Sequence, residues 1–430
     1  MQTGSSPDRM LPRGAGAADP ARGLPPTHES WLPNEHSLYR PRHGRRQRLA
    51  LVAAVVFFLA PALAFTVGVR PTRFENRALA EFPAPGSGWG FFTGLLPWGT
   101  DNLPLREGAV RAGDAISAGV FGDEPRHDAA GPERTAAGFP IVIRGKEDWL
   151  YLGTDASNKC RPKRTLDEVF GALRELRDAV ESSGRRFVLV AAPDKSTAVP
   201  RFLPDEYAGK SCSTEVSARF WARATTEADV IDLRPALDDI STRSGRMLWD
   251  ANDSHWTYEG GMAMTYAIAD RISPGVTSTW LVGDRQETTW PADIIPLLGD
   301  TAQRSLRTYT LAPDGVTDRS KYVKSDFRTP LSLIQPQPGL PGTVVPSTGF
   351  IADSFTQFAS PFLAAAFRDL TIVHPETVAA EAEQSAKELL VSRDVLVLEL
   401  AERNLASGVS PVLDDEVINA LVKVLANHPR

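Results

Sequence analysis

The chain has 430 residues, a net charge of −6, 42% hydrophobic residues and 23% charged residues. This length holds one large domain or two of average size, and the composition is that of a globular protein. The charge is uneven, because the first 48 residues carry eight Arg and four acidic residues, whereas the remainder carries 39 basic and 49 acidic ones. Nucleic-acid binding depends on neutralising phosphates, so an acidic main domain without a basic run argues against a nucleic-acid partner.

The N-terminal part of the sequence reads as a tail followed by a membrane segment. Residues 1–48 contain seven Pro and five Gly without helical or strand periodicity, which predicts a disordered tail. Residues 49–69 carry no charge, and a helix of this length crosses a hydrocarbon core of about 30 Å. More Arg residues lie before this segment than after it, so the tail is predicted to be cytoplasmic and the rest extracytoplasmic, as in a single-pass cell-membrane protein. The alternative is a cleaved signal peptide, since Ala62-Leu63-Ala64 resembles a cleavage site.

Beyond the membrane segment, residues 70–138 are rich in Pro and Gly and predict a stalk and entry region. Residues 139–430 form the predicted folded domain. A capping box at Thr165–Glu168 opens an amphipathic helix, and the apolar run at 187–192 follows as a strand buried on both faces. A second helix at about 215–225 leads to a short strand at 230–232. Alternating helices and strands predict an α/β fold with a mostly parallel sheet between two layers of helices.

The same alternation returns near the C-terminus. Helices are predicted at about 354–367, 376–390 and 414–426, with strands at 370–373 and 395–400. Between the two regular regions, residues 275–345 have scattered Pro and Gly and weak periodicity. We expect an irregular insertion there, with a strand near 306–311.

Two short motifs supply a carboxylate, an imidazole and a hydroxyl. In Asp253-Ser254-His255-Trp256, a carboxylate two residues before the histidine can hold one ring nitrogen and leave the other free to accept a proton. In Asp353-Ser354-Phe355, the serine follows an apolar run and opens a helix, which displays Oγ beside backbone N–H groups that suit an oxyanion. Helix capping is the simpler explanation for each motif taken alone.

Six segments in order carry a resemblance to a known family: Glu75–Ala80, Gly145–Leu150, Pro193–Lys195, Asp253–Trp256, Asp353–Phe355 and Glu402–Arg403. Together they resemble the exported, SGNH-like polysaccharide O-acetyltransferases of the alginate-acetylation (AlgJ and AlgX) type. The resemblance implies a triad of Asp253, His255 and Ser354, in an order permuted relative to ordinary SGNH esterases, in which the serine comes first. The family usually has Gly before the Asp-Ser pair, whereas this chain has Ala352, which would be strained if that position required a positive φ.

The resemblance also implies a function. We expect an SGNH-like three-layer α/β domain, membrane-anchored and extracytoplasmic, that transfers acetyl groups through an acetyl-serine to a polysaccharide. The backbone N–H of Ser354 would bind the oxyanion, and no metal or bound cofactor is expected. A multi-pass membrane O-acyltransferase is implied as the source of the acetyl group. A carbohydrate esterase with the same triad and an inactive membrane-tethered scaffold or polysaccharide-binding protein are the alternatives.

A few other side chains are candidates for roles near the site. Trp256, Tyr258 and Lys195 could line a substrate cleft, although core packing for Trp256 and capping or a surface ion pair for Lys195 are the commoner roles. Cys160 and Cys212 form a disulfide or remain two free thiols. They have no neighbouring His and therefore do not have the spacing of a zinc site.

Overall fold

The computed structural model describes residues 45–67, 82–102, 136, 138–298, 302–323, 325–335 and 340–430, and the chain divides into two compact units, Met1–Arg70 and Pro71–Arg430. In the first unit, helix α1 (Arg45–Thr66) begins within the predicted tail, whose residues 1–44 lie outside the described residues. No described helix has the length and apolar composition that a membrane span requires. Of the predicted stalk, the described part contains helix α2 (Trp89–Asp101), and residues 70–81 and 103–135 lie outside the described residues.

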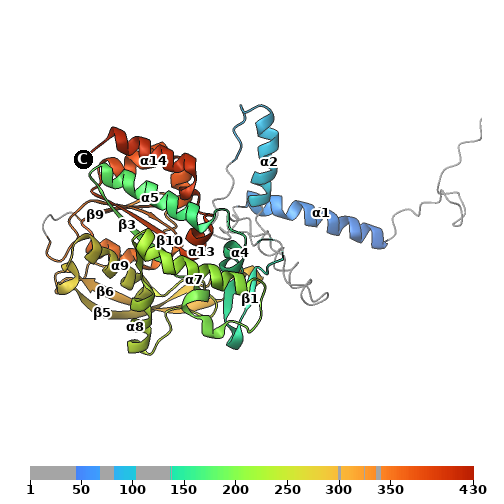
Figure 1. Cartoon of the computed structure of the whole chain (residues 1–430). Helices are drawn as coiled ribbons and strands as arrows, with labels where there is room; N and C mark the ends of the chain where they lie inside the picture. The colour runs from blue at the N-terminus through green and yellow to red at the C-terminus, as the bar shows by residue number, and fades with distance from the viewer. Residues whose placement is uncertain are drawn as a thin grey trace, which may run out of the picture. The chain divides into compact units, whose positions relative to one another are not determined.

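A six-stranded sheet forms the centre of the second unit, in the order β4-β3-β10-β8-β9-β7. Strands β3, β9 and β10 of this sheet are labelled in Figure 1. Its strands are β3 (Arg186–Ala192), β4 (Val230–Asp232), β7 (Leu331–Ile334), β8 (Thr348–Ala352), β9 (Asp369–Val373) and β10 (Val395–Ala401). All neighbours pair in parallel except β7, which runs antiparallel to β9 at the edge. The prediction of a mostly parallel sheet is confirmed.

Helices cover both faces of this sheet, so the predicted three-layer arrangement is also confirmed. In β10, Val395 and Val397 belong to one hydrophobic cluster, whereas Leu396 and Leu398 belong to the other. The first cluster includes side chains of α8 (Arg234–Ser244), α9 (Tyr258–Ile272) and α10 (Ser360–Ala366). The second includes side chains of α5 (Leu166–Ser182), α7 (Lys210–Glu227) and α14 (Asp415–Asn427). Because both faces are covered, the central strands are mostly apolar instead of alternating with polar residues, and the polar side chains they do contain, such as Glu399 in β10, are buried.

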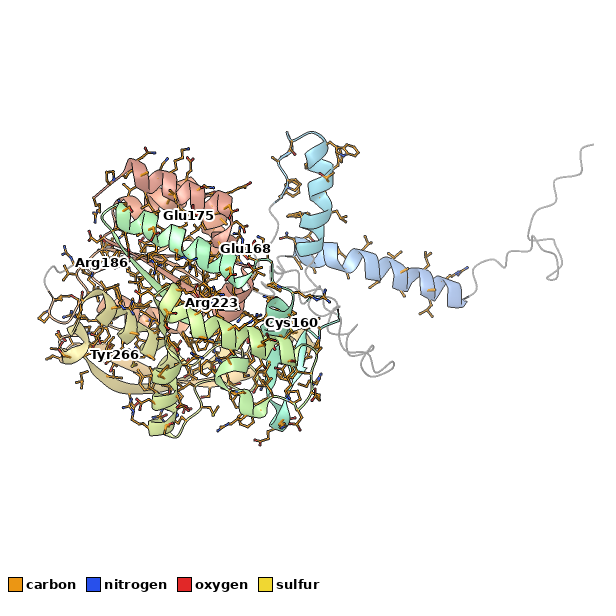
Figure 2. All side chains as sticks on the ribbon, in the orientation of Figure 1. Cys160, Glu168, Glu175, Arg186, Arg223 and Tyr266 are labelled. Carbon is orange, nitrogen blue, oxygen red and sulfur yellow. A yellow bond between two sulfur atoms is a disulfide. The ribbon has the colours of Figure 1, made fainter. Side chains whose placement is uncertain are left out.

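The start of α5 is fixed by a capping box and lies near a disulfide. The Thr165 hydroxyl accepts a hydrogen bond from the Glu168 N–H, and the Glu168 carboxylate accepts one from the Thr165 N–H at 2.7 Å, as the sequence predicted. Cys160, at the end of α4 (Thr154–Cys160), is bonded to Cys212 in α7 (Figure 2). Of the two alternatives for these cysteines, the structure therefore has the disulfide.

The region predicted as an irregular insertion is more regular than expected. It contains a hairpin of β5 (Leu281–Pro291) and β6 (Gln303–Ala312), as well as the edge strand β7. The predicted strand near 306–311 is confirmed by β6. The prediction missed β5 because β5 is largely exposed along its length, so its sequence lacks the alternation by which a half-buried strand is identified.

Two predicted C-terminal helices are divided. The segment after Asp353 forms a 3₁₀ helix, η7 (Ser354–Phe358), and then α10, whose second residue is Pro361. Proline lacks a backbone N–H and favours the first turn of a new helix, which accounts for the break. The helix predicted at about 376–390 is divided into α11 (Pro375–Ala380), α12 (Ala382–Ala386) and the π-helical turn η8 (Lys387–Val391). The non-helical Glu381 separates α11 from α12.

The remaining elements are short: β1 (Val142–Arg144), η3 (Lys146–Asp148), β2 (Leu150–Leu152), α6 (Lys195–Ala198), η4 (Pro200–Phe202), η5 (Val276–Thr279), η6 (Ile295–Leu298), α13 (Glu402–Ser407) and η9 (Pro411–Leu413).

Removing the disulfide is expected to destabilise the second unit. The two cysteines are 52 residues apart, and chain-entropy arguments give about 4 kcal/mol for a loop of that size. A Cys160→Ala/Cys212→Ala variant is expected to unfold roughly 10 °C below the wild type. Thermal unfolding followed by circular dichroism measures this, and wild type treated with reductant serves as the matched control. Equal melting temperatures for variant and oxidised wild type would contradict the prediction.

Candidate functional site

Three motifs meet where three neighbouring strands end. Strands β3, β10 and β8 are adjacent and parallel, so their carboxyl ends lie at one edge of the sheet. Asp194-Lys195 follows β3, Glu402-Arg403 follows β10 and Asp353-Ser354 follows β8. In open α/β sheets this edge is where ligands bind.

Asp353 holds the turn that presents Ser354. Its carboxylate accepts hydrogen bonds from the Phe355 N–H at 3.0 Å and from the Ala401 N–H, at the end of β10, at 2.7 Å. Ser354 is the first residue of η7, where a backbone N–H has no acceptor within the helix. The N–H of Ser354 therefore suits the oxyanion role predicted for it.

Ala352 does not strain this turn. It is the last residue of β8, its methyl group is fully buried in the core, and it is not among the residues with a positive φ. The conformation here is one that any L-residue adopts, so glycine is not required at this position.

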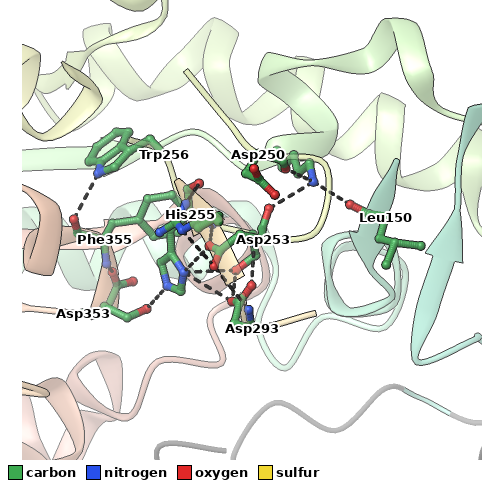
Figure 3. A network of polar contacts seen from close by, with 12 residues as sticks. Leu150, Asp250, Asp253, His255, Trp256, Asp293, Asp353 and Phe355 are labelled. Atoms are coloured by element: carbon green, nitrogen blue, oxygen red, sulfur yellow. Dashed lines mark hydrogen bonds and ion pairs between the residues drawn. The ribbon is translucent and has the colours of Figure 1, made fainter. Parts of the chain in front are cut away.

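His255 lies between the hydroxyl of Ser354 and the carboxylate of Asp253. Figure 3 shows the ring beside Asp253 and Asp293. Its Nε2 is 2.7 Å from Ser354 Oγ, and its Nδ1 is 3.0 Å from Asp253 Oδ1. The same Oδ1 accepts the backbone N–H of His255 at 2.9 Å, which fixes the carboxylate relative to the ring. The structure thus brings together the three side chains that the sequence singled out. In this arrangement the imidazole can take the hydroxyl proton while the carboxylate orients the ring.

Contacts between the two motifs hold this geometry. The indole Nε1 of Trp256 donates to the Phe355 carbonyl at 3.0 Å (Figure 3). One turn into α9, Gly261 packs against η7 so closely that a Cβ at this position would lie 2.1 Å from the Phe358 carbonyl oxygen. Helix α9 therefore approaches η7 at this distance only because residue 261 has no side chain.

Two residues that the sequence did not reveal complete the site, and both come from the β5–β6 region. Asp293 Oδ2 is 3.2 Å from His255 Nδ1, and Asp293 Oδ1 accepts the Ser254 N–H at 2.7 Å. Arg304, in β6, places Nε 3.2 Å from Asp253 Oδ2 and donates to the His255 carbonyl at 3.2 Å. Neither residue stands at a spacing that connects it to the Asp253 motif, so no signal in the single sequence could have found them.

The charges around His255 change its pKa. Burial opposes the charged ring, but the negative charge of Asp293 and the hydrogen bonds to Asp253 and Asp293 outweigh it and raise the pKa of His255 to about 9. Burial also acts against ionised Asp293, yet the neighbouring imidazolium and the hydrogen bonds from Ser254 hold the pKa of that carboxyl below its usual value. Burial and the charge of Asp293 raise the pKa of Asp253, so Asp293 is the carboxylate that the site keeps ionised beside the imidazolium.

The spacing of three side chains also resembles a cation site. Asp253, His255 and Asp293 each place a potential ligand atom within 4.8 Å of the others. However, the guanidinium of Arg304 already pairs with Asp253, and the outer nitrogen of His255 faces Ser354. A fixed positive charge beside the carboxylate disfavours a metal ion, so these residues fit a serine triad better than a metal centre.

Three residues predicted to line a substrate cleft are buried instead. Lys195 is 1% exposed, and its Nζ donates to backbone carbonyls at 2.6–3.0 Å: those of Leu150, Asp250, Ala251 and Asp253. Its ammonium therefore holds the loop that carries Asp253, and burial lowers its pKa to about 8. Trp256 and Tyr258 are 0% and 4% exposed and pack in the core. The prediction that these three residues line a substrate cleft was wrong, because their side chains are buried and hold the elements that carry the reacting groups.

A buried ionic network ties the ends of β3 and β10 to α4. Lys159 Nζ lies 2.8 Å from a carboxylate oxygen of Asp194 and 2.8 Å from one of Glu402. Arg403 lies 3.1 Å from Asp194 on one side and over the Phe355 ring on the other. All four side chains are at most 5% exposed, so removing one partner would leave an uncompensated buried charge.

Adding a methyl group at position 261 is expected to separate the two motifs. Gly261→Ala would force α9 and η7 apart, whereas Gly171→Ala, in the middle of α5, meets no atom within 4 Å and is the matched control. The control is expected to gain about 1 kcal/mol of stability, because Ala has the higher helix propensity. Gly261→Ala is expected to lose at least about 2 kcal/mol. Urea unfolding measures both, and equal effects at the two positions would contradict the close packing of α9 on η7.

Comparisons with known proteins show the family to which the chain belongs. Residues 142–391 match the family described as SGNH hydrolase-like domain, acetyltransferase AlgX. A relative from Pseudomonas putida, described as a probable alginate O-acetylase AlgJ, is 26% identical over 166 residues, which are 38% of this chain and 41% of the relative. The chain thus matches less than half the length of that relative.

Solved structures give similar results. The O-acetyltransferase domain of Pseudomonas putida AlgJ is 18% identical and has a TM-score of 0.45, with 66% of this chain and 99% of that chain covered. Pseudomonas aeruginosa AlgX is 17% identical and has a TM-score of 0.45, with 66% and 68% covered. Bacillus cereus PatB1 is 13% identical and has a TM-score of 0.40, with 62% and 97% covered. Because the family match spans more than half of the chain, the protein belongs to the SGNH hydrolase-like family of acetyltransferase AlgX.

Proposed function

We propose that this protein is an O-acetyltransferase that moves an acetyl group through an acetyl-serine onto a hydroxyl of a polysaccharide. The observation that carries the proposal is the continuous hydrogen-bonded series from Asp253 through His255 to Ser354. Membership of an acetyltransferase family supports acyl transfer as the type of reaction. The relative described as an alginate O-acetylase suggests an exported polysaccharide as the class of acceptor.

The reaction proceeds in two displacements. In the first, His255 Nε2 takes the proton from Ser354 Oγ as that oxygen bonds to the acetyl carbonyl carbon. The N–H of Ser354 stabilises the resulting oxyanion, and His255 returns the proton to the leaving group of the donor. In the second, His255 takes the proton from a sugar hydroxyl as it attacks the acetyl-serine. Collapse of the second oxyanion releases the acetylated sugar, and the proton passes from His255 to Ser354.

The alternatives differ in acceptor or in activity. A carbohydrate esterase would use the same three side chains with water in place of the sugar hydroxyl. The alternative of an inactive scaffold rested on backbone strain at Ala352. Ala352 does not have a positive φ, so that ground for the alternative is removed. The geometry of the three side chains supports an active enzyme over that alternative.

We also propose that the domain works outside the cell membrane, with the N-terminal segment as its anchor. The disulfide between Cys160 and Cys212 supports an oxidising compartment, where such bonds form and persist. An acetyl group used there has to be supplied across the membrane, so a multi-pass membrane O-acyltransferase is the proposed partner that delivers it. The polysaccharide acceptor would meet the domain on the same side.

Replacing the nucleophile tests the mechanism. Ser354→Ala is expected to lower turnover of 4-nitrophenyl acetate by about 10³-fold or more, because the variant has no oxygen to acetylate. The exposed Ser278→Ala is the matched control and is expected to keep wild-type turnover. Mass spectrometry of the full chain is expected to show one acetyl group in the wild type and none in Ser354→Ala.

Turnover by Ser354→Ala at the rate of the control would contradict the assignment of the nucleophile. Addition of an oligosaccharide acceptor separates the two enzyme functions. An acetylated sugar formed faster than free acetate indicates a transferase, whereas acetate alone indicates an esterase.

The rate of Ser354 acetylation is expected to increase with pH up to an unusually alkaline value. His255 can act as a base only when it is neutral, and its pKa of about 9 keeps it protonated below that pH. The rate of Ser354 acetylation is therefore expected to rise about tenfold per pH unit up to pH 9 and to level above it. Stopped-flow measurement of the first turnover checks this. A limb centred near the ordinary histidine pKa of about 6.5 would contradict it.

A further inference from the structure

Two carboxylates reach the same ring nitrogen of His255. Asp253 Oδ1 lies 3.0 Å and Asp293 Oδ2 lies 3.2 Å from Nδ1, which carries a single proton (Figure 3). We propose that the two have different roles: Asp253 orients the ring, and Asp293 is a positioning residue that sets the charge state of His255. The proposal rests on the function proposed above, because it concerns the base of that reaction.

The pairing of charges distinguishes the two carboxylates. Asp253 is compensated by Arg304, whose fully buried guanidinium lies 3.2 Å from Oδ2. Asp293 receives its other hydrogen bonds from the backbone N–H and the hydroxyl of Ser254, which carry no charge. Among the residues that the structure describes, the imidazolium is therefore the cation that forms a direct ion pair with Asp293. Protonation of His255 completes a pair with Asp293 rather than with Asp253.

The charged groups around the ring come from four elements. Its own loop supplies Asp253, the loop after β5 supplies Asp293, β6 supplies Arg304 and α6 supplies Lys195, whose ammonium binds the Asp253 carbonyl. On the remaining side, η7 contributes the hydroxyl of Ser354 and the uncharged rings of Phe355 and Phe358.

The balance of these charges favours a proton on His255. When Asp253, Asp293 and Arg304 are all ionised, these three groups and the ring are together neutral with the ring protonated and carry −1 without that proton, and burial and the charge of Asp293 raise the pKa of Asp253. The Lys195 ammonium donates to backbone carbonyls and also interacts electrostatically with Asp293 and Asp253, so it partly offsets their negative charge. His255 is 8% exposed and the Asp293 side chain is 34% exposed, so water screens their attraction from the Asp293 side.

Asp293 accordingly affects the reaction in two ways. It makes His255 a stronger base, which favours removal of the Ser354 proton, and it moves the pH at which the ring becomes neutral upward. Asp293→Asn is therefore expected to shift the acid limb of Ser354 acetylation to lower pH by at least one unit. The same change is expected to lower the plateau rate above that limb, because a weaker base transfers the proton less readily.

The decisive measurement is the titration of His255 itself. In the full chain labelled with ¹³C-histidine, NMR gives the pKa of His255, and a His255→Gln variant assigns its resonance. Asp293→Asn is expected to lower this pKa by more than one unit, and Asp293→Glu, which keeps the charge, is expected to lower it by less than half a unit. Asp284→Asn is the matched control, since it makes the same change at an exposed position on β5.

A pKa for Asp293→Asn equal to that of Asp284→Asn would overturn the inference. Thermal unfolding verifies that each variant is folded, and Asp293→Ser serves as a second neutral variant if the asparagine variant does not fold. The titration does not depend on acetyl transfer, so it is separate from the proposed function. A shifted pKa in a chain that acetylates nothing would support the role of Asp293 and reject the transferase.

The reaction of Ser354 with a sulfonyl fluoride adds a kinetic readout. The rate of covalent labelling depends on neutral His255 and needs neither donor nor acceptor. Its pH midpoint is expected to fall in Asp293→Asn by the same amount as the NMR pKa. A midpoint that stays at the wild-type value would show that Asp293 has only a structural role.

Discussion

The parallel register of β3, β10 and β8 is the constraint on which the site depends. Ala401 pairs with Ala192 of β3, and Glu399 pairs with Ala352 of β8, so β10 extends two residues beyond the end of β8. This offset places the Ala401 N–H where the Asp353 carboxylate accepts it, which fixes the turn of Ser354. The same alignment brings the acidic residues that follow β3 and β10 onto Lys159. A change of one residue in this register would disconnect both the nucleophile and the ionic network.

A second buried carboxyl group binds the helical turn η7, which carries the nucleophile. Glu399, in β10, is fully buried and accepts a hydrogen bond from the Thr356 hydroxyl at 2.8 Å. Burial and the neighbouring charge of Asp353 raise its pKa well above the usual value. The turn of Ser354 thus rests on one carboxyl that is strongly hydrogen-bonded by N–H groups and another that resists ionisation. These two carboxyl groups support the turn rigidly, because both are buried away from water.

What the sequence predicted correctly depends on neighbours along the chain. The capping box of α5, the apolar run of β3 and the Asp-x-His spacing each involve residues within a few positions of one another. The errors involve contacts that no local pattern records. Lys195 binds backbone carbonyls, which every residue possesses, and Asp293 reaches Asp253 from 40 residues away on a hairpin with weak alternation. Trp256 and Tyr258 were wrongly predicted to line a cleft. A sequence motif includes residues that pack in the core as well as residues that react, and the sequence alone does not distinguish the two.

The division of the site between sheet and hairpin has a consequence for how such enzymes diversify. The hydroxyl and imidazole are held by elements packed on the central sheet, whereas Asp293 and Arg304 arrive on a hairpin that pairs only with itself. Exchange of that hairpin alone would leave the nucleophile in place and alter the basicity of its partner. The pH range in which an enzyme of this kind operates would then change with the hairpin, through Asp293 beside His255 and through Arg304 beside Asp253, while Ser354 stays in place.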